Sequence, residues 1–256
     1  MATLSVVLIV KNAEQELRQA LESAKWADEI IVYDSGSEDA TRSIAAEYTS
    51  HVIVDTDWQG FGLQRQKAQA HASGDWVLML DADEVISEPL ADEIRALIKD
   101  NNQQFYYEIP RLSWVFGRFI RHSGWYPDCV IRLYPREKAA YNDALVHEKV
   151  VAGAELSLGR LSSDLLHYTY RDLEHYLVKS AGYAKAWADQ RELRGKKTTI
   201  RQGVLHAVGC FVKMYILRMG FLDGRAGLVL ALLSAHSTFA KYADLAIRAM
   251  EKKSSS

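Results

Sequence analysis

Two acidic side chains at the end of one apolar segment are the residues best suited to chemistry. The segment Trp76–Leu80 carries no charge, and Asp81 and Asp83 follow it directly, one residue apart. Mg²⁺ prefers oxygen ligands and is typically held by one or two carboxylates together with substrate phosphates. The pair therefore suits a nucleoside diphosphate bridged by a metal. The alternative interpretation is a solvated acidic turn after a strand.

A second acidic loop lies earlier in the chain. The short apolar segment Glu29–Tyr33 leads into Asp34, and the loop continues through serine, glycine and acidic residues to Asp39. Ser37 and Asp39 are residue types that cap the first turn of a helix. Asp34 and Asp81 thus both occur where a strand is expected to end.

The first half of the chain alternates short apolar segments with helical periods. Strands are predicted over residues 4–10, 29–33, 51–56 and 76–80, and helices over residues 17–24, 44–48, 64–73 and 87–98. This alternation predicts an α/β fold whose sheet is mostly parallel and has helices on both faces. Ligands of such sheets bind at the carboxyl ends of the strands, so Asp34 and Asp81 are expected to face one crevice.

The second half has a different rhythm. Strands are predicted over residues 105–110, 130–134 and 146–151, and helix over residues 172–193 and 200–250 with a break at 220–224. Aromatic and basic side chains are dense between Trp114 and Tyr126, which suggests the part that receives a second substrate. We therefore expect three segments, with boundaries at 1–104, 105–193 and 194–256.

The charge is divided unevenly along the chain. The whole sequence of 256 residues has a net charge of −2. Residues 1–190 hold 19 Lys and Arg against 29 Asp and Glu, whereas residues 191–256 hold 12 against 4. The two cysteines, Cys129 and Cys210, make a disulfide framework improbable. The near-neutral total gives no support for a nucleic-acid partner.

The basic last segment alternates its charges with apolar residues. A basic amphipathic helix of this kind can lie in the headgroup region of an anionic membrane surface. The alternative is a helical bundle with ordinary surface lysines. The first ten residues have no basic side chain before their apolar run, so a buried strand is expected there rather than a signal peptide. No apolar stretch of about 18 residues predicts a transmembrane helix.

Four ordered motifs resemble the family 2 glycosyltransferases of the GT-A type. Val6-Val-Leu-Ile-Val-Lys-Asn12 is similar to their first strand, and Val32-Tyr-Asp34-Ser-Gly-Ser-Glu-Asp39-Ala-Thr41 resembles their acidic loop. Gly60-Phe-Gly-Leu-Gln-Arg65-Gln-Lys67-Ala68 and Ala72–Asp83 resemble the segment that leads to their metal motif. The resemblance covers about residues 1–155. Gln66 departs from it, since many members have Asn there.

The resemblance implies a GT-A nucleotide-sugar fold and assigns the donor side of the site. It implies that Asp34 contacts the base or ribose, with helix capping as the alternative role. It implies Asp83 as a ligand of Mg²⁺ or Mn²⁺. His147 could complete the metal shell or orient the diphosphate, with an edge-strand histidine that has no catalytic task as the alternative. The residues that it implies for binding the nucleotide sugar are Asn12, Asp34, Arg65, Lys67, Asp81 and Arg132. For Lys67 an exposed helix face, and for Arg132 a solvent-facing strand position, are the alternatives.

The reaction implied by the resemblance is attack of an acceptor hydroxyl on the anomeric carbon of the donor sugar. A single displacement needs a general base. Glu148 is our first candidate for that base and Asp128 the second. Trp125 and Tyr126 have aromatic faces that suit sugar rings, with core packing as the rival interpretation. His167 and Lys179 have no assigned place, although either could reach an anionic acceptor.

Three further stretches resemble one subgroup, the bacterial lipopolysaccharide inner-core β-1,4-glucosyltransferases. They are Trp58–Gly62, the pair His147-Glu148 and the motif Leu217–Gly224. The resemblance implies an inverting transfer of glucose from UDP-glucose to a heptose. It also implies a cytoplasmic enzyme held at the inner face of the bacterial inner membrane, with lipopolysaccharide or another anionic glycolipid as acceptor.

Two other functions stay open at this point. One is a glycosyltransferase for another lipid-linked or capsular glycan, which the spacing of the motifs does not separate from the first. The other is a non-catalytic membrane-surface protein that binds nucleotide sugars. A dinucleotide oxidoreductase is disfavoured because no Gly-x-Gly-x-x-Gly follows the first strand.

Overall fold

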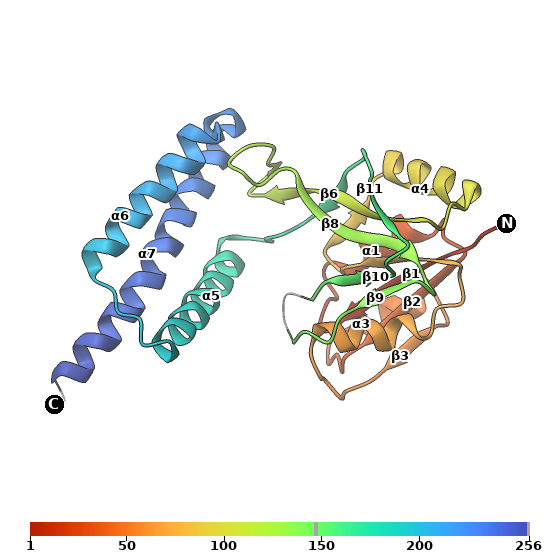
Figure 1. Ribbon diagram of the computed structural model, residues 1–256, viewed down its shortest axis with the longest axis horizontal. Helices are drawn as coiled ribbons and strands as arrows, with labels where there is room; N and C mark the ends of the chain where they lie inside the picture. The colour runs from red at the N-terminus through yellow and green to blue at the C-terminus, as the bar shows by residue number, and fades with distance from the viewer. Residues whose placement is uncertain (146–147, 255–256) are drawn as a thin grey trace. The chain divides into compact units, whose positions relative to one another are not determined.

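The protein is described by a computed structural model that covers residues 1–145 and 148–254 (Figure 1). The chain forms two units. The first comprises Met1–Arg111 and Asp128–His167, and the second comprises Leu112–Pro127 and Tyr168–Ser256. The chain therefore leaves the first unit after Arg111, returns to it at Asp128 and leaves it again after His167.

The first unit is a sheet with helices on both faces. Its elements are β1 (Leu4–Val10), α1 (Leu17–Ala24), β2 (Glu29–Asp34), α2 (Thr41–Ala46), β3 (Val52–Val54), α3 (Phe61–Gln69), β4 (Trp76–Leu80), β5 (Glu84–Ile86), α4 (Glu88–Asp100), β6 (Phe105–Val115), β8 (Asp128–Pro135), β9 (Ala139–Tyr141), β10 (Val150–Ala152), β11 (Ser157–Arg160) and β12 (Leu165–His167). Strand β6 continues into the second unit at its carboxyl end.

The sheet has a parallel part and an antiparallel part. Its strand order is β3-β2-β1-β4-β8-β6-β12-β5. Strands β3, β2, β1 and β4 are parallel, whereas β8 is antiparallel to both β4 and β6. The expected α/β fold is confirmed, and the parallel arrangement belongs to the strands of the first half. The carboxyl ends of β1, β2 and β4 consequently share one edge.

Alternation along β1 explains the two layers of helices. Leu4, Val6 and Leu8 pack in a core that includes residues of α1, α2 and α4. Val7 faces the opposite side and packs in a second core with residues of α3 and of the β9–β10 hairpin. Successive side chains of a strand point to opposite faces, so a strand that is apolar throughout must be covered on both.

Local signals set the helix boundaries. Ser87 caps α4, because its hydroxyl accepts a hydrogen bond from the backbone N–H of Leu90 at 3.3 Å, and Pro89 lies in the first turn. Asp172 caps α5 in the same way through the N–H of His175. These caps confirm helix starts that the sequence predicts.

The second unit is built mainly from helices. Its elements are β7 (Arg118–Phe119), α5 (Leu173–Leu193), α6 (Ile200–Phe211), the π-helical turn η1 (Val212–Leu217), the 3₁₀ turn η2 (Gly220–Asp223) and α7 (Gly224–Ser254). Arg248 on α7 pairs with Asp189 at 2.6 Å and with Glu192 at 2.9 Å, both on α5. The chain turns between α6 and α7 at the break that the sequence predicts.

These units differ from the three expected segments. Helix α5 belongs with the basic last segment because the rings of Trp187 and Tyr242 are in contact, tilted by 44° with centroids 4.9 Å apart, in addition to the ion pairs of Arg248. The loop 112–127 also belongs to this second unit. Within the described residues, no helix is long and apolar enough to cross a membrane.

Candidate active site

Asp81 lies at the end of β4 between two buried arginines. Its Oδ1 accepts a hydrogen bond from Arg65 Nη2 at 2.7 Å, and its Oδ2 pairs with Arg132 Nη2. The two guanidinium groups come from α3 and β8 and are only 5% and 6% exposed. Burial disfavours the charged carboxyl, but the charges of Arg132 and Arg65 outweigh this effect and hold the pKa of Asp81 well below its usual range.

A second carboxylate, Glu84, belongs to this cluster and was not singled out from the sequence. Glu84 is fully buried, and its Oε1 accepts from Arg132 at 2.7 Å and from Arg111 at 3.3 Å. Its Oε2 accepts from the backbone N–H of Asp81 at 3.0 Å. An acid directly after Asp83, at the start of a buried strand, was the available signal. Glu84 fixes the arginines and the turn that carries Asp81.

The two candidate bases are each held by an arginine of this cluster. Glu148 Oε1 accepts from Arg65 Nε at 3.0 Å, and the Glu148 side chain is 15% exposed. Asp128 Oδ2 accepts from Arg111 Nε at 3.0 Å and also pairs with Arg111 Nη2. Asp81, Arg65, Arg132 and Glu148 are thus brought together, with Asp128 linked to them through Arg111.

Two buried donors of the cluster have no partner. The Nη1 of Arg65 and the Nε of Arg132 are buried and make no hydrogen bond with any residue that the structure describes. Buried polar groups are nearly always paired, and an unpaired donor costs about 1–3 kcal/mol. Anionic oxygens such as those of a phosphate would satisfy both donors.

Asp83 points to a different neighbour from Asp81. Its Oδ2 lies 3.3 Å from Nε2 of His167, a residue of β12 to which the sequence assigned no place. Asp83 keeps 31% of its side chain exposed and His167 keeps 14%. His147, the other metal candidate, lies outside the described residues. Among the residues that the structure does describe, no group of three or more His, Cys, Asp or Glu side chains is arranged to hold a metal.

Asp34 performs a structural task with one oxygen and leaves the other available. Its Oδ1 accepts from the backbone N–H groups of Gly36 at 2.9 Å and Ser37 at 2.8 Å. Its Oδ2 is buried and has no partner. Asn12 ties the same loop to β1, since its Oδ1 accepts from the N–H of Glu38 at 2.9 Å. The loop after β2 is therefore rigid and still offers one buried acceptor.

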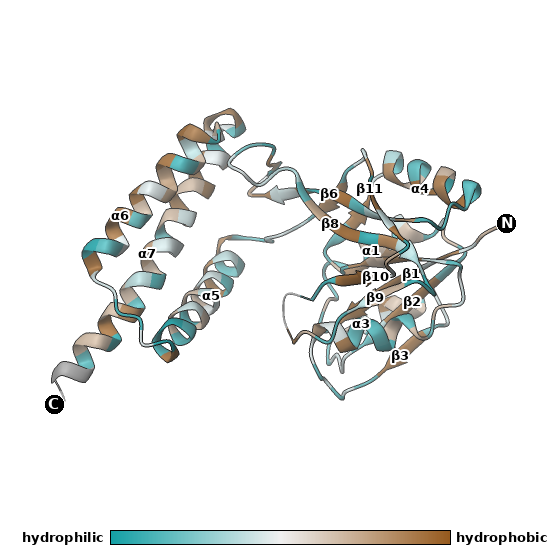
Figure 2. Cartoon of the chain, viewed as in Figure 1, coloured by the Kyte–Doolittle hydropathy of each residue, from teal (hydrophilic) through white to brown (hydrophobic). Residues whose placement is uncertain are grey.

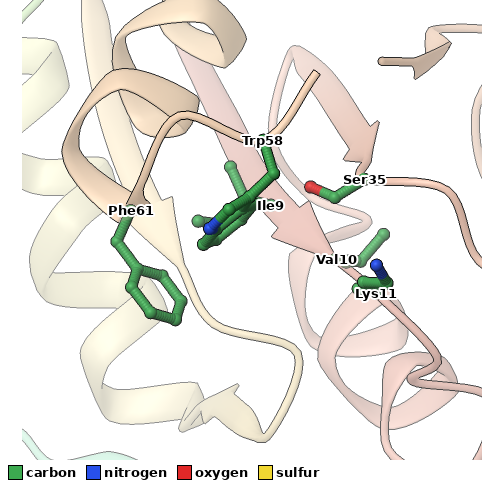
Figure 3. Close-up of a pocket in the computed structure, with 6 residues that line it drawn as sticks. All are labelled: Ile9, Val10, Lys11, Ser35, Trp58 and Phe61. Atoms are coloured by element: carbon green, nitrogen blue, oxygen red, sulfur yellow. The ribbon is translucent and has the colours of Figure 1, made fainter. Parts of the chain in front are cut away.

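A cavity of about 400 Å³ opens beside this loop (Figure 3). It is lined by Ile9, Val10, Lys11, Ser35, Trp58 and Phe61. The rings of Trp58 and Phe61 meet edge to face with centroids 4.9 Å apart. Its walls are mainly apolar and aromatic, a composition that suits a planar ring. The cavity lies where the carboxyl ends of β1 and β2 meet.

Two residues of α3 are placed away from Asp81. Lys67 pairs with Asp55 at 2.8 Å and Asp57 at 3.3 Å, on the loop after β3. Gln66, where many family members have Asn, donates to the carbonyl of Tyr141 at 2.6 Å and holds the β9 hairpin. These residues have different partners because consecutive side chains of a helix, here Arg65, Gln66 and Lys67, point in different directions.

The two aromatic candidates for the acceptor belong to the second unit. Trp125 is half-buried and packs against Tyr170, with ring centroids 6.3 Å apart. Tyr126 lies under the guanidinium of Arg121 at 5.3 Å. Lys179, which had no assigned place, lies 5.5 Å from the ring centre of Tyr170. Within this unit, Trp125 is therefore packed against the apolar core.

The first unit has the attributes of a protein that binds a nucleoside diphosphate. An aromatic cavity, a buried acceptor and an arginine-flanked acidic motif share the carboxyl edge of a parallel sheet, where such folds bind ligands. The sequence model described as glycosyl transferase family 2 matches residues 5–178. The chain belongs to this family, as the resemblance implies.

The similar proteins include glycosyltransferases of bacterial glycolipids. An uncharacterized glycosyltransferase of Rickettsia prowazekii is 30% identical over 96% of this chain and 87% of its own length. A lipopolysaccharide core biosynthesis glycosyltransferase, LpsC of Rhizobium meliloti, is 26% identical over 94% of this chain and 93% of its own. An Escherichia coli UDP-Glc:alpha-D-GlcNAc-diphosphoundecaprenol beta-1,3-glucosyltransferase, WfgD, is 27% identical over 45% of this chain and 50% of its own.

Proposed function

We propose that this protein is an inverting glycosyltransferase that moves glucose from UDP-glucose to a heptose of the lipopolysaccharide inner core. The observation that supports it most is the pair of unpartnered, buried guanidinium N–H groups of Arg65 and Arg132 beside Asp81. Two fixed guanidinium groups with unused N–H donors match the hydrogen-bond acceptors of a diphosphate. The similarity to LpsC supports the choice of acceptor.

The donor would bind along the edge of the sheet. The uracil would occupy the cavity between Trp58 and the end of β1, with the free Oδ2 of Asp34 accepting from the base or a ribose hydroxyl. Asn12 holds this loop in place from β1. Arg65 and Arg132 would then receive the diphosphate. The choice of UDP-glucose is supported by the name of the similar Escherichia coli enzyme.

A divalent cation fits beside Asp83. The carboxylate oxygen of Asp83 and the imidazole nitrogen of His167 lie 3.3 Å apart, and both are donor types that divalent cations accept. Asp83 and His167 would hold it, and His147 is the further candidate implied by the resemblance. A bound Mg²⁺ or Mn²⁺ would supply Lewis-acid stabilisation of the charge on the leaving diphosphate. Asp81 orients the arginines instead of binding the ion.

Glu148 is the proposed general base. The acceptor hydroxyl must lose its proton as its oxygen attacks the anomeric carbon, and a carboxylate within hydrogen-bond reach can take it. Glu148 is tied to Arg65 through a single contact, whereas Asp128 is held by two nitrogens of Arg111. Asp128 stays the second candidate. Trp125 and Tyr126 are proposed to contact the acceptor.

A lipid-linked acceptor requires that the enzyme work at a membrane. We propose that the basic residues of 194–256 hold the protein at the cytoplasmic face of the bacterial inner membrane. Two alternatives follow from the same site: transfer to another lipid-linked or capsular glycan, and binding of a nucleotide sugar without catalysis. The similarity to the undecaprenol-linked enzyme of Escherichia coli favours the first of these alternatives over the second.

A screen of nucleotide sugars against rough lipopolysaccharide acceptors tests the proposal. Each donor is incubated with and without Mg²⁺ or Mn²⁺, and transfer is followed by mass of the acceptor. We expect one added hexose from UDP-glucose, dependent on the metal. Transfer only to undecaprenol-linked glycans would favour the first alternative. UDP-glucose binding without transfer or hydrolysis for any acceptor would favour the non-catalytic one.

A further inference from the structure

The turn between α6 and α7 exposes a group of apolar side chains. Leu217 is 72% exposed, Ile216 54% and Phe221 49%, although all three belong to ordered helical turns. We call this group the apolar tip, and it consists of Val212, Ile216, Leu217, Met219, Phe221 and Leu222. Figure 2 shows the hydrophobic residues in brown where α6 passes into α7. Apolar side chains gathered in this way mark an interaction surface.

Polar contacts behind the tip fix its shape. Asp223 is 1% exposed and accepts from the backbone N–H groups of Arg121 at 3.2 Å and His122 at 2.9 Å. The Nδ1 of His122 lies 3.0 Å from the same carboxylate. The N–H of Ser123 donates to the carbonyl of Arg218 at 2.9 Å. The loop 112–127 therefore braces the turn from behind, so the apolar side chains are held outward.

A glycine contact also keeps the turn tight. A Cβ atom on Gly227 would lie 2.0 Å from the carbonyl oxygen of Gly220, so only glycine allows η2 to pack on the first turn of α7. The tip is consequently a compact, supported feature. Its exposed apolar residues are a property of the folded unit and do not come from a frayed end.

The exposed charged side chains of the segment that contains the tip, residues 194–243, are all positive. Between Arg194 and Ala243, all of it described by the structure, the only acid is the buried Asp223, against eight Lys and Arg. Lys213, Arg218 and Arg225 lie within or beside the tip and are exposed. Residues 112–127 also contain no acid. An apolar surface with exposed Lys and Arg on the same turns is complementary to an anionic lipid headgroup layer.

We propose that the apolar tip inserts into the headgroup region of an anionic bilayer, with Lys213, Arg218 and Arg225 at the level of the lipid phosphates. This assigns the membrane attachment to one turn, and it rests on the proposed function in taking the acceptor to be lipid-linked. A second copy of the chain would also cover the apolar side chains. It would bring the exposed Lys213, Arg218 and Arg225 of two copies together, so the charges favour a lipid surface.

Vesicle binding of a double variant of the full chain, Leu217→Ser with Phe221→Ser, tests the insertion. Sedimentation with vesicles of phosphatidylglycerol and phosphatidylcholine should show an affinity lower by about tenfold or more, because two apolar side chains no longer leave water. The matched control is Val178→Ser with Leu193→Ser on α5, whose apolar side chains are also exposed. The control should bind as the unmodified chain does. Equal losses in both variants would overturn the proposal.

A second pair of variants tests the position of the charges. Arg218→Gln with Arg225→Gln removes two cations at the tip, and Lys196→Gln with Lys197→Gln removes two from the linker before α6. Both variants lose two positive charges. If the basic segment were attracted to the vesicles only by its total charge, the two variants would lose equal vesicle affinity. Insertion at the tip predicts a loss of about tenfold or more for the arginine pair only. Equal losses in this comparison would contradict the assignment to one turn.

Two readouts separate this proposal from the other possibilities. Transfer of glucose to a short acceptor without a lipid should be unchanged in the tip variants, so a failure of vesicle binding leaves the proposed enzyme activity measurable. Size-exclusion chromatography reports a second copy at the same surface. A tip variant that turns a dimer into a monomer and still binds vesicles like the unmodified chain would overturn the insertion.

Discussion

Asp81 and Asp83 come from one short motif but have different surroundings. Asp81 is enclosed by Arg65 and Arg132, whereas Asp83 lies beside His167. The sequence predicts the pair because both follow one strand, but it does not show which arginines approach each carboxylate. Those arginines come from α3 and β8 and are brought to β4 by sheet pairing and helix packing. Asp81 is therefore an orienting acid and Asp83 a proposed metal ligand because segments distant in the sequence bring two arginines to Asp81 and a histidine to Asp83.

The first prediction concerns Glu148. In Glu148→Gln the amide oxygen can still accept from Arg65, so the donor site should keep its geometry. Because the base is lost, transfer should slow by about 10²–10⁴-fold. The measurement is UDP-glucose affinity by calorimetry beside the steady-state turnover, with Asp128→Asn as the comparison. A variant that loses donor affinity but transfers at the normal turnover would contradict the role of base.

The second prediction concerns Lys67 and the pH dependence of Asp55. The hydrogen bond from Lys67, followed by that from the Tyr33 hydroxyl, lowers the pKa of Asp55 to about 2. The charged carboxylate thus stabilises the fold above its ordinary pKa of 3.8, and this contribution is lost as the pH falls toward 2. In Lys67→Met the pKa should rise toward 3.8, measured by NMR titration. The affinity for UDP should not change in this variant. A large fall in UDP affinity would show that Lys67 binds the nucleotide.

At the scale of the elements, the first half of the chain was well predicted from its pattern. The strands Leu4–Val10 and Trp76–Leu80 have the predicted bounds, because apolar segments of this length, interrupted only by Ser5 in the first, belong to buried strands. Glu84–Ile86 was not predicted as a strand, since three residues give no period to detect. It pairs with Leu165–His167, far along the chain. Long-range pairings of short strands leave no local signal.

The third prediction tests the approach of α3 to the segment before Glu148. A Cβ atom on Gly62 would lie 1.9 Å from the carbonyl oxygen of Asn142, so Gly62→Ala must displace residues 142–145. Transfer should fall by about 10²-fold, because Glu148 follows this segment and small misplacements of catalytic groups are costly. The matched control is Gly209→Ala on α6, where a Cβ atom meets nothing within 4 Å. The control should keep full activity and gain up to about 1 kcal/mol of stability by urea unfolding.

At the scale of the whole molecule, the net charge of −2 combines two surfaces with different tasks. The acidic first part supplies Asp34, Asp81, Asp83 and Glu148 to the candidate site, and the basic last part surrounds the apolar tip. The sequence predicts this division from charge counts. It does not predict that residues 112–127 join the basic part, because that arrangement depends on the contact between His122 and Asp223 across about 100 positions.

The central claim is metal-assisted transfer from a nucleotide sugar at Asp83. The most direct measurement is the initial rate of glucose transfer from UDP-glucose with Mg²⁺ or Mn²⁺ for the unmodified chain, Asp83→Ala and the control Asp92→Ala, an exposed acid paired with Arg95. We predict a loss of at least about a hundredfold in Asp83→Ala and none in the control. A transfer rate in Asp83→Ala equal to that of the unmodified chain would contradict the account.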